Sequence, residues 1–158
     1  MKATYLFPSK YKKLGWSVFI PASIFGLLHA IFHFEFGFFD WNVFSIFIDE
    51  FMGEKKLMGF VDNNVLDEIL GILIIISGFV VAFSKSKDED ELISKIRLES
   101  LVWATFLNYT ILLFAMLLVY DMGFLWVMIF NMFTTLLFFI IRFTWMVNKL
   151  KKLVRNEE

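Results

Sequence analysis

Long apolar runs alternate with short polar segments along this chain of 158 residues. The runs cover approximately residues 14–36, 65–83, 98–120 and 124–147. A helix rises about 1.5 Å per residue, so about 20 apolar residues cross a bilayer core of about 30 Å. We therefore predict an all-α fold, an integral membrane four-helix bundle that occupies the whole chain, 1–158, as a single domain.

The longest connection, between the first two runs, shows a second pattern. Within residues 43–60 apolar side chains recur at helical spacing, with acidic residues and glycine on the opposite face. A helix with one apolar and one charged face can lie flat at a membrane surface. We predict an interfacial amphipathic helix over about 43–60, in the first outer loop.

Basic residues gather on one side of the predicted bundle. Of the 15 Lys and Arg residues, 12 lie before the first run, between the second and third, or after the fourth. Short loops rich in Lys and Arg remain cytoplasmic. Both termini are therefore predicted to be cytoplasmic. The five Trp residues agree with these boundaries, because each lies near an end of a predicted span, where Trp is enriched.

Composition narrows the chemistry. The chain is 59% hydrophobic and contains 22 Phe, far beyond the usage of a soluble domain. It has no Cys, which excludes thiolate metal ligands and cysteine nucleophiles. The net charge is −1, and membrane topology accounts for the basic clusters, so we expect no nucleic-acid partner.

Small residues in the first two runs predict a close helix pair. They recur at helical spacing, as Ala22, Gly26 and Ala30 in the first run and as Gly71, Gly78 and Ala82 in the second. Such stripes let membrane helices approach closely. Antiparallel packing of these faces would bring Asp67 to the depth of His33, with His29 about 6 Å deeper.

Polar side chains inside the last two runs predict contacts across a helical hairpin. Asn108 lies at a depth that matches three candidate partners on the fourth run, Asn131, Thr134 and Thr135. One such hydrogen bond is worth about 0.6 to 2 kcal/mol in a membrane. Arg142, near the cytoplasmic end, is predicted to form an ion pair with Glu99 that holds the hairpin closed.

The stretch HAIFH, residues 29–33, contains both histidines of the chain. Two histidines four residues apart share a helix face and can bind one divalent metal ion. The carboxylates that could complete the shell are Glu35, Asp49, Glu50, Asp67 and Glu68. The same groups could form a proton-linked switch, because histidine titrates near neutral pH. A third interpretation is purely structural, since acidic residues suit a helix N-terminus in any case.

Three segments carry a resemblance: YLFPSKYKKLGW near the start, DEILGILIIISGFVVAFSK in the middle, and SKIRLESLVWATFLNYTILLFAMLLVY later. With them the chain resembles small uncharacterised four-span inner-membrane proteins of bacteria. The resemblance implies a bacterial inner (cytoplasmic) membrane location and brings no activity with it.

Two classes of function follow from these patterns. In the first, the chain is a non-enzymatic membrane protein that acts as a sensor, scaffold or accessory subunit, embedded in lipid. Its partners would be a second copy or another membrane or cytoplasmic protein. In the second, the cluster of His29, His33, Glu35, Asp67 and Glu68 binds a cation or relays protons. The protein would then be a small transporter or a membrane metalloenzyme.

Overall fold

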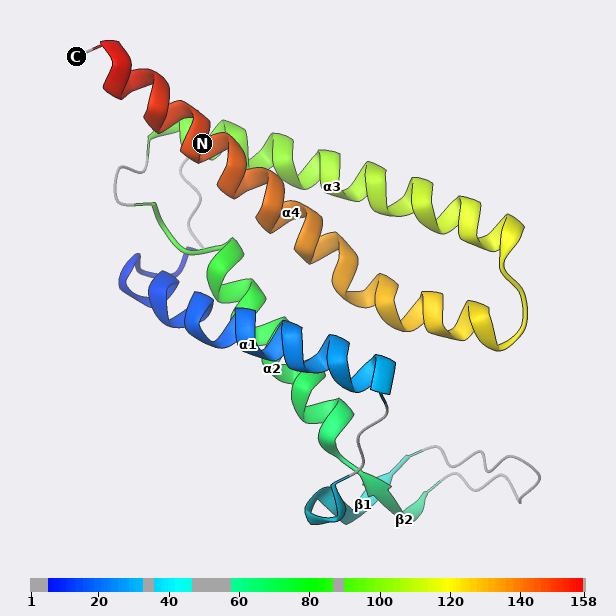
Figure 1. Ribbon diagram of the computed structural model, residues 1–158. Helices are drawn as coiled ribbons and strands as arrows, with labels where there is room; N and C mark the ends of the chain where they lie inside the picture. Colours follow the sequence, from blue (N-terminus) through cyan, green and yellow to red (C-terminus); the bar gives the residue numbers. More distant parts are fainter. Residues whose placement is uncertain (1–5, 33–35, 47–57, 87–89, 158) are drawn as a thin grey trace. The chain divides into compact units, whose positions relative to one another are not determined.

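The computed structural model describes residues 6–32, 36–46, 58–86 and 90–157 of the chain. In chain order their elements are α1 (Lys10–Phe32), η1 (Gly37–Phe39), β1 (Asp40–Ser45), β2 (Gly59–Asn64), α2 (Leu66–Ala82), α3 (Glu91–Leu118) and α4 (Met122–Glu157) (Figure 1). The described residues are mainly helical, as the apolar runs predict. The two short strands were not predicted.

Three helices, α1, α3 and α4, are long and apolar enough to cross a membrane. The second apolar run, 65–83, coincides with α2, which has 17 residues. At 1.5 Å per residue α2 is about 25 Å long, shorter than a bilayer core of about 30 Å. By length and composition, three helices can therefore cross a membrane. The remaining helix, α2, is the shortest of the four.

The prediction of an interfacial helix over 43–60 is wrong at both of its ends. Residues at these ends belong to β1 and β2, which pair antiparallel from Asp40 opposite Asn64 to Ser45 opposite Gly59. The residues at these ends fit an alternation with period two as well as a helical spacing. In the strand pair Val43 lies opposite Val61, and Phe44 lies opposite Phe60. Branched and aromatic side chains favour the strand. Residues 47–57 lie outside the described part of the chain.

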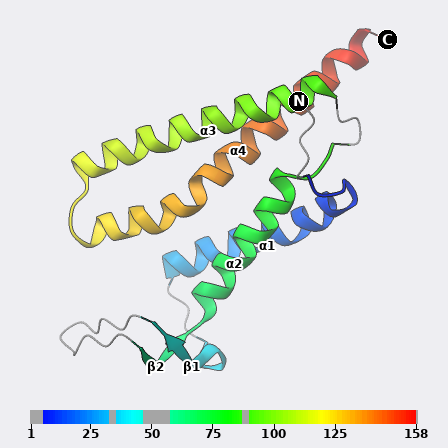
Figure 2. The same cartoon turned by 180° about the vertical axis from the view of Figure 1, so that it is seen from behind.

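The chain divides into two compact units, Met1–Ile20 with Ile74–Glu158, and Pro21–Leu73. In the first unit α3 and α4 form an antiparallel hairpin and lie side by side in both views (Figures 1 and 2). The connection between them is short and contains Asp121 at φ 55°, in the left-handed region. The helical hairpin predicted from the third and fourth runs is thus present.

The core of the first unit contains a series of stacked aromatic rings. Phe83 stacks on Phe79 and on Phe139, with ring centroids 5.6 Å apart in each pair. Phe139 stacks in turn on Phe143 at 5.8 Å. These rings join the end of α2 to α4, and both Phe139 and Phe143 are buried.

Glycine permits close packing within this unit. A Cβ atom on Gly78 would lie 2.5 Å from Leu136 Cδ2 and 3.1 Å from Phe19 Cε2. A Cβ atom on Gly15 would lie 2.9 Å from Val81 Cγ2. Gly78, a member of the predicted stripe, therefore packs against α4 as well as α1, and the predicted stripe did not include Gly15.

The N-terminal segment pairs with the chain that leaves α2. The backbone N–H of Phe7 donates to the carbonyl of Phe83 at 2.9 Å, and the N–H of Lys85 donates to the carbonyl of Phe7 at 2.9 Å. The start of α1 and the end of α2 consequently lie at the same end of the first unit.

In the second unit the base of the strand pair is fixed to the start of α2. The side-chain amide of Asn64 donates to Asp40 Oδ1 at 2.8 Å and to the carbonyl of Phe36 at 3.2 Å. Its oxygen accepts the N–H of Leu66 at 3.3 Å, which caps the helix. α2 begins one residue after the start of the second apolar run, and Asp67 and Glu68 lie in its first turn.

Candidate functional site

The two helix ends in the second unit meet through an ion pair. His29 lies in the last turn of α1, and Asp67 lies in the first turn of α2. His29 Nε2 is 2.7 Å from Asp67 Oδ1. An acidic side chain at a helix N-terminus and a basic one at a C-terminus each interact favourably with the helix dipole. This pair therefore suits both helix ends.

The surroundings of the two partners differ. The His29 side chain is 13% exposed and that of Asp67 is 75% exposed. His29 Nδ1 is buried and has no hydrogen-bond partner among the described residues. Because Nε2 needs a hydrogen to bond with the carboxylate oxygen, the neutral form that fits carries its proton on Nε2. With Asp67 so exposed, the pair is worth about 0 to 1 kcal/mol in stability.

Asp67 contacts His29, the deeper of the two histidines in the predicted arrangement. Its predicted depth relative to His33 concerns a residue outside the described part of the chain. Residues His33 and Glu35 lie outside the described part of the chain, as do Asp49 and Glu50.

Glu68, the remaining candidate metal ligand, forms its hydrogen bond with a residue outside this pair. Its Oε1 accepts a hydrogen bond from Asn63 Nδ2 at 2.8 Å. Within residues 6–32, 36–46, 58–86 and 90–157, no three His, Cys, Asp or Glu side chains come together as a metal site requires. In the described part of the chain these candidates therefore form an ion pair, His29–Asp67, and no metal cluster.

The polar cluster in the α3–α4 hairpin is present. Asn108 is 3% exposed, and its Oδ1 accepts hydrogen bonds from Thr134 Oγ1 at 2.5 Å and from Asn131 Nδ2 at 3.2 Å. Thr134 rather than Thr135 supplies the hydroxyl. Thr134 Oγ1 also lies 3.1 Å from the carbonyl oxygen of Asn131. These bonds join the two helices and involve no titratable group.

The predicted ion pair between Glu99 and Arg142 is not formed. Glu99 lies 4.0 Å from Lys95 on its own helix, and the Arg142 guanidinium lies over the Trp103 ring at 4.7 Å from its centroid. Arg142 and Trp103 still connect α4 to α3, through a cation–π contact. A guanidinium suits this contact because it is planar and weakly hydrated.

Arg97 is a buried contact residue that was not predicted from the sequence. Arg97 is 7% exposed, donates to the carbonyl of Ser84 at 3.3 Å, and lies 4.9 Å from the Phe143 ring centroid. It had been counted only among the basic residues that set topology. The signal was its place on the face of α3 that includes Ile93, Ser100 and Ala104, all buried.

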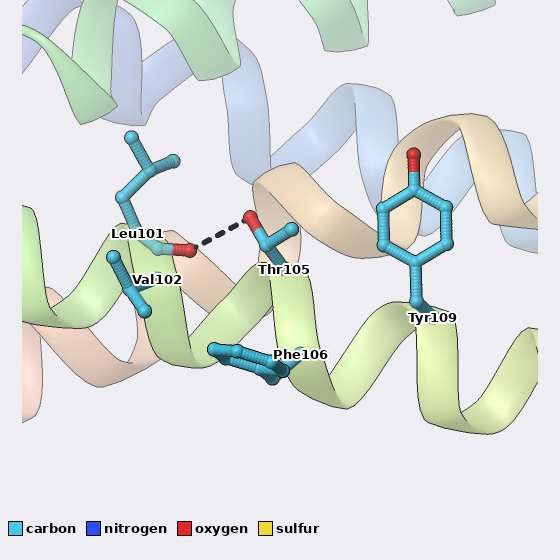
Figure 3. A pocket seen from close by; sticks show the side chains of 5 residues that line it. All are labelled: Leu101, Val102, Thr105, Phe106 and Tyr109. Atoms are coloured by element: carbon cyan, nitrogen blue, oxygen red, sulfur yellow. Dashed lines mark hydrogen bonds between the residues drawn. The ribbon is translucent and has the colours of Figure 1, made fainter.

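Surface hollows occur on α3 and between α3 and α4 in the described part of the chain. The first, about 370 Å³, is lined by Leu101, Val102, Thr105, Phe106 and Tyr109 of α3 (Figure 3). Its lining is almost wholly apolar, and the Thr105 hydroxyl donates to the carbonyl of Leu101 at 2.9 Å on the same helix. The Thr105 hydroxyl is therefore engaged within its own helix.

The second hollow, also about 370 Å³, lies between the N-terminal part of α3 and the C-terminal part of α4. We call it the α3–α4 groove, and it is lined by Leu92, Lys95, Ile96, Glu99, Met146, Lys149, Leu150 and Leu153. Five of these eight side chains are apolar and three are charged. The sequence reasoning did not predict this groove, because it depends on the relative rotation of the two helices.

No protein-family model, no curated protein and no solved structure matches this chain.

Proposed function

We propose that this chain is a small non-enzymatic protein of a bacterial inner membrane that acts as an accessory or scaffold subunit. It binds an amphipathic helix of a partner protein in the α3–α4 groove. The observation that carries the proposal is the composition of this groove, an apolar floor with a charged rim, at the end of a hairpin that continues past its interfacial tryptophans.

The tryptophans support a cytoplasmic position for the groove. Trp103 and Trp145 are the aromatic residues expected at the membrane interface, and Arg142 and Lys149 lie over their respective rings. The groove lies beyond them, toward the start of α3 and the end of α4. Since α4 has 36 residues, it is about 54 Å long and exceeds a bilayer core of about 30 Å.

The lining of the groove supports a protein helix as the occupant. Leu92 and Leu153 are exposed although they lie in a segment expected to face water or headgroups. Burying such side chains against a partner gains roughly 25 cal/mol per Å². Lys95 and Lys149 on the rim favour acidic residues on the flank of the partner, and Glu99 favours one basic residue.

Four spans with both termini in the cytoplasm form part of the proposal. Phe7 pairs with the backbone on either side of Ser84, which supports a return of α2 across the membrane that α1 crosses. Four crossings also keep all three basic clusters on one side, in accordance with the preference of Lys and Arg for cytoplasmic loops. A span as short as α2, with 17 residues, is accommodated by local thinning of the bilayer.

Site-specific photocrosslinking in native membranes tests the proposal. A photoreactive residue at Leu153 in the groove should capture one discrete protein, and Leu150→Lys should abolish the capture because it places a charge on the apolar floor. Leu113, exposed on α3 outside the groove, is the matched control position. Crosslinking at Leu153 to lipid alone, or capture that Leu150→Lys does not change, would contradict the proposal.

The His29–Asp67 ion pair favours a second candidate function, a proton-linked role. A histidine bonded to an exposed carboxylate, with a buried second nitrogen, can exchange a proton with the outer surface. In reconstituted vesicles His29→Gln should then abolish a proton flux that Glu68→Gln leaves intact. A divalent metal ion retained by the purified protein and lost in His29→Gln would instead favour the metal interpretation. A flux that is absent between about pH 5 and 8, with no metal retained, removes this candidate.

A further inference from the structure

The strand pair of the second unit carries exposed apolar side chains at the end that lies away from α2. Phe44 and Phe60 lie directly opposite each other, with ring centroids 5.7 Å apart, and are 59% and 72% exposed. Ile46 and Met58 follow immediately beyond the paired residues and are also exposed. We call these four residues the hairpin patch. None of its residues lines the α3–α4 groove or takes part in the His29–Asp67 pair.

Polarity changes along one face of this strand pair. Residues paired directly across two strands project from the same face, and so do residues two apart along a strand. The face with Phe44 and Phe60 therefore also holds the pair Asn42 and Asp62, and at its base the pair Asp40 and Asn64. The face is polar next to α2 and apolar at the far end.

The base of the strand pair is attached to a helix end. Only Val65 separates β2 from α2, and its N–H donates to the carbonyl of Phe39 at 2.9 Å. Trp41, in the first strand, donates from Nε1 to the carbonyl of Phe38 at 3.1 Å, and both side chains are exposed. Exposed aromatic residues of this kind are enriched at the membrane interface.

We propose that the β1–β2 strand pair inserts the hairpin patch into the boundary between headgroups and acyl chains, in the leaflet that faces away from the basic loops. Lipid is the occupant that the attachment favours, because a strand pair fixed to the outer end of a short span lies within reach of the bilayer surface. A two-stranded hairpin alone is at best marginally stable in water, and burial of its apolar end in lipid stabilises it. An open strand edge with exposed Phe would otherwise promote aggregation.

Spin labels measure the depth of the patch directly. The chain has no Cys, so a single introduced Cys carries the only label. Labels at Phe44→Cys and Phe60→Cys, in vesicles of phosphatidylcholine and phosphatidylglycerol, should be accessible to oxygen and several-fold less accessible to a water-soluble nickel chelate. The matched label at Asp62→Cys, on the same face and nearer the base, should show the reverse.

Labels at Ile46→Cys and Met58→Cys leave the pair of Phe rings intact and guard against a local loss of structure. They should report the same accessibility to oxygen as the label at Phe60. Equal access of the nickel chelate at positions 60 and 62 would overturn the proposal, because the patch would then face water. Labels shielded from both reagents would overturn it too, since a second copy or another protein would then cover the patch.

Discussion

The contact between Asn108 and α4 gives the most definite energetic prediction. Asn108 joins the two long helices through one oxygen that accepts hydrogen bonds from Thr134 and Asn131. Asn108→Ala removes both bonds between the helices, whereas Thr134→Val removes only the shorter one. Val has nearly the shape of Thr, so the second change isolates the hydroxyl.

The structure sets the size of the effect. A hydrogen bond between membrane helices contributes on average about 0.6 kcal/mol and at most about 1.7 kcal/mol in double-mutant cycles. Asn108→Ala should therefore lower the free energy of unfolding by about 1 to 3 kcal/mol. Thr134→Val should cost about 1 kcal/mol, because the bond at 2.5 Å is the shorter of the two.

A matched threonine on α3 supplies the control. The Thr110 hydroxyl bonds only to the carbonyl of Phe106 on its own helix, at 2.8 Å, so Thr110→Val should change stability by less than about 0.5 kcal/mol. Unfolding in mixed micelles with increasing denaturing detergent measures all three variants. If Thr134→Val and Thr110→Val prove equal, or if Asn108→Ala is neutral, the hydrogen bonds do not hold the hairpin together.

Three further predictions concern packing and backbone strain. Gly78→Val should destabilise the first unit by about 1 to 3 kcal/mol, because its side chain would collide with Leu136. Arg97→Met should lower the unfolding midpoint, at a cost of about 1 to 2 kcal/mol, by removing the contact with Phe143 and a hydrogen bond. Asp121→Ile should cost about 1 to 2 kcal/mol, because a branched residue disfavours the left-handed region, while Asp121→Gly should be neutral or stabilising. Detergent-induced unfolding followed by circular dichroism measures all of them.

Each of these predictions has its own control. Leu136→Ala should partly rescue Gly78→Val, because the smaller side chain restores the space that the glycine provides. Arg155→Met, at an exposed position of α4, should leave stability unchanged where Arg97→Met does not. Equal effects of these two arginine changes, or an Asp121→Gly variant less stable than Asp121→Ile, would contradict the packing and the turn described here.

The sequence predicted the long helices well because their physical signal is strong and continuous. An apolar run of about 20 residues has few alternatives, so α3, α4 and the contact of Asn108 with Asn131 followed from the pattern. The outer loop was harder, since residues such as Val43 and Phe44 satisfy a strand and an amphipathic helix alike. Local periodicity could not decide between them.

The candidate site was predictable only in part. His29 and Asp67 were both among the predicted site residues, but their contact depends on how the ends of α1 and α2 meet, which no local pattern encodes. Arg97 was assigned to topology alone because charge counting ignores which face of a helix a residue occupies. The α3–α4 groove depends on how two helices rotate against each other, and no local pattern encodes that rotation.

A measurement of membrane topology tests the account most directly, because the proposed positions of the groove and the hairpin patch both depend on it. Single Cys residues at Ser9, Lys85 and Asn156 would be labelled with a membrane-impermeant maleimide in sealed and in opened cells, beside Asp62 and Met122. Four spans predict that Ser9, Lys85 and Asn156 are labelled only in opened cells, and that Asp62 and Met122 are labelled in sealed cells. Labelling of Ser9 from the side opposite to Lys85 would contradict four spans and the arrangement that follows from them.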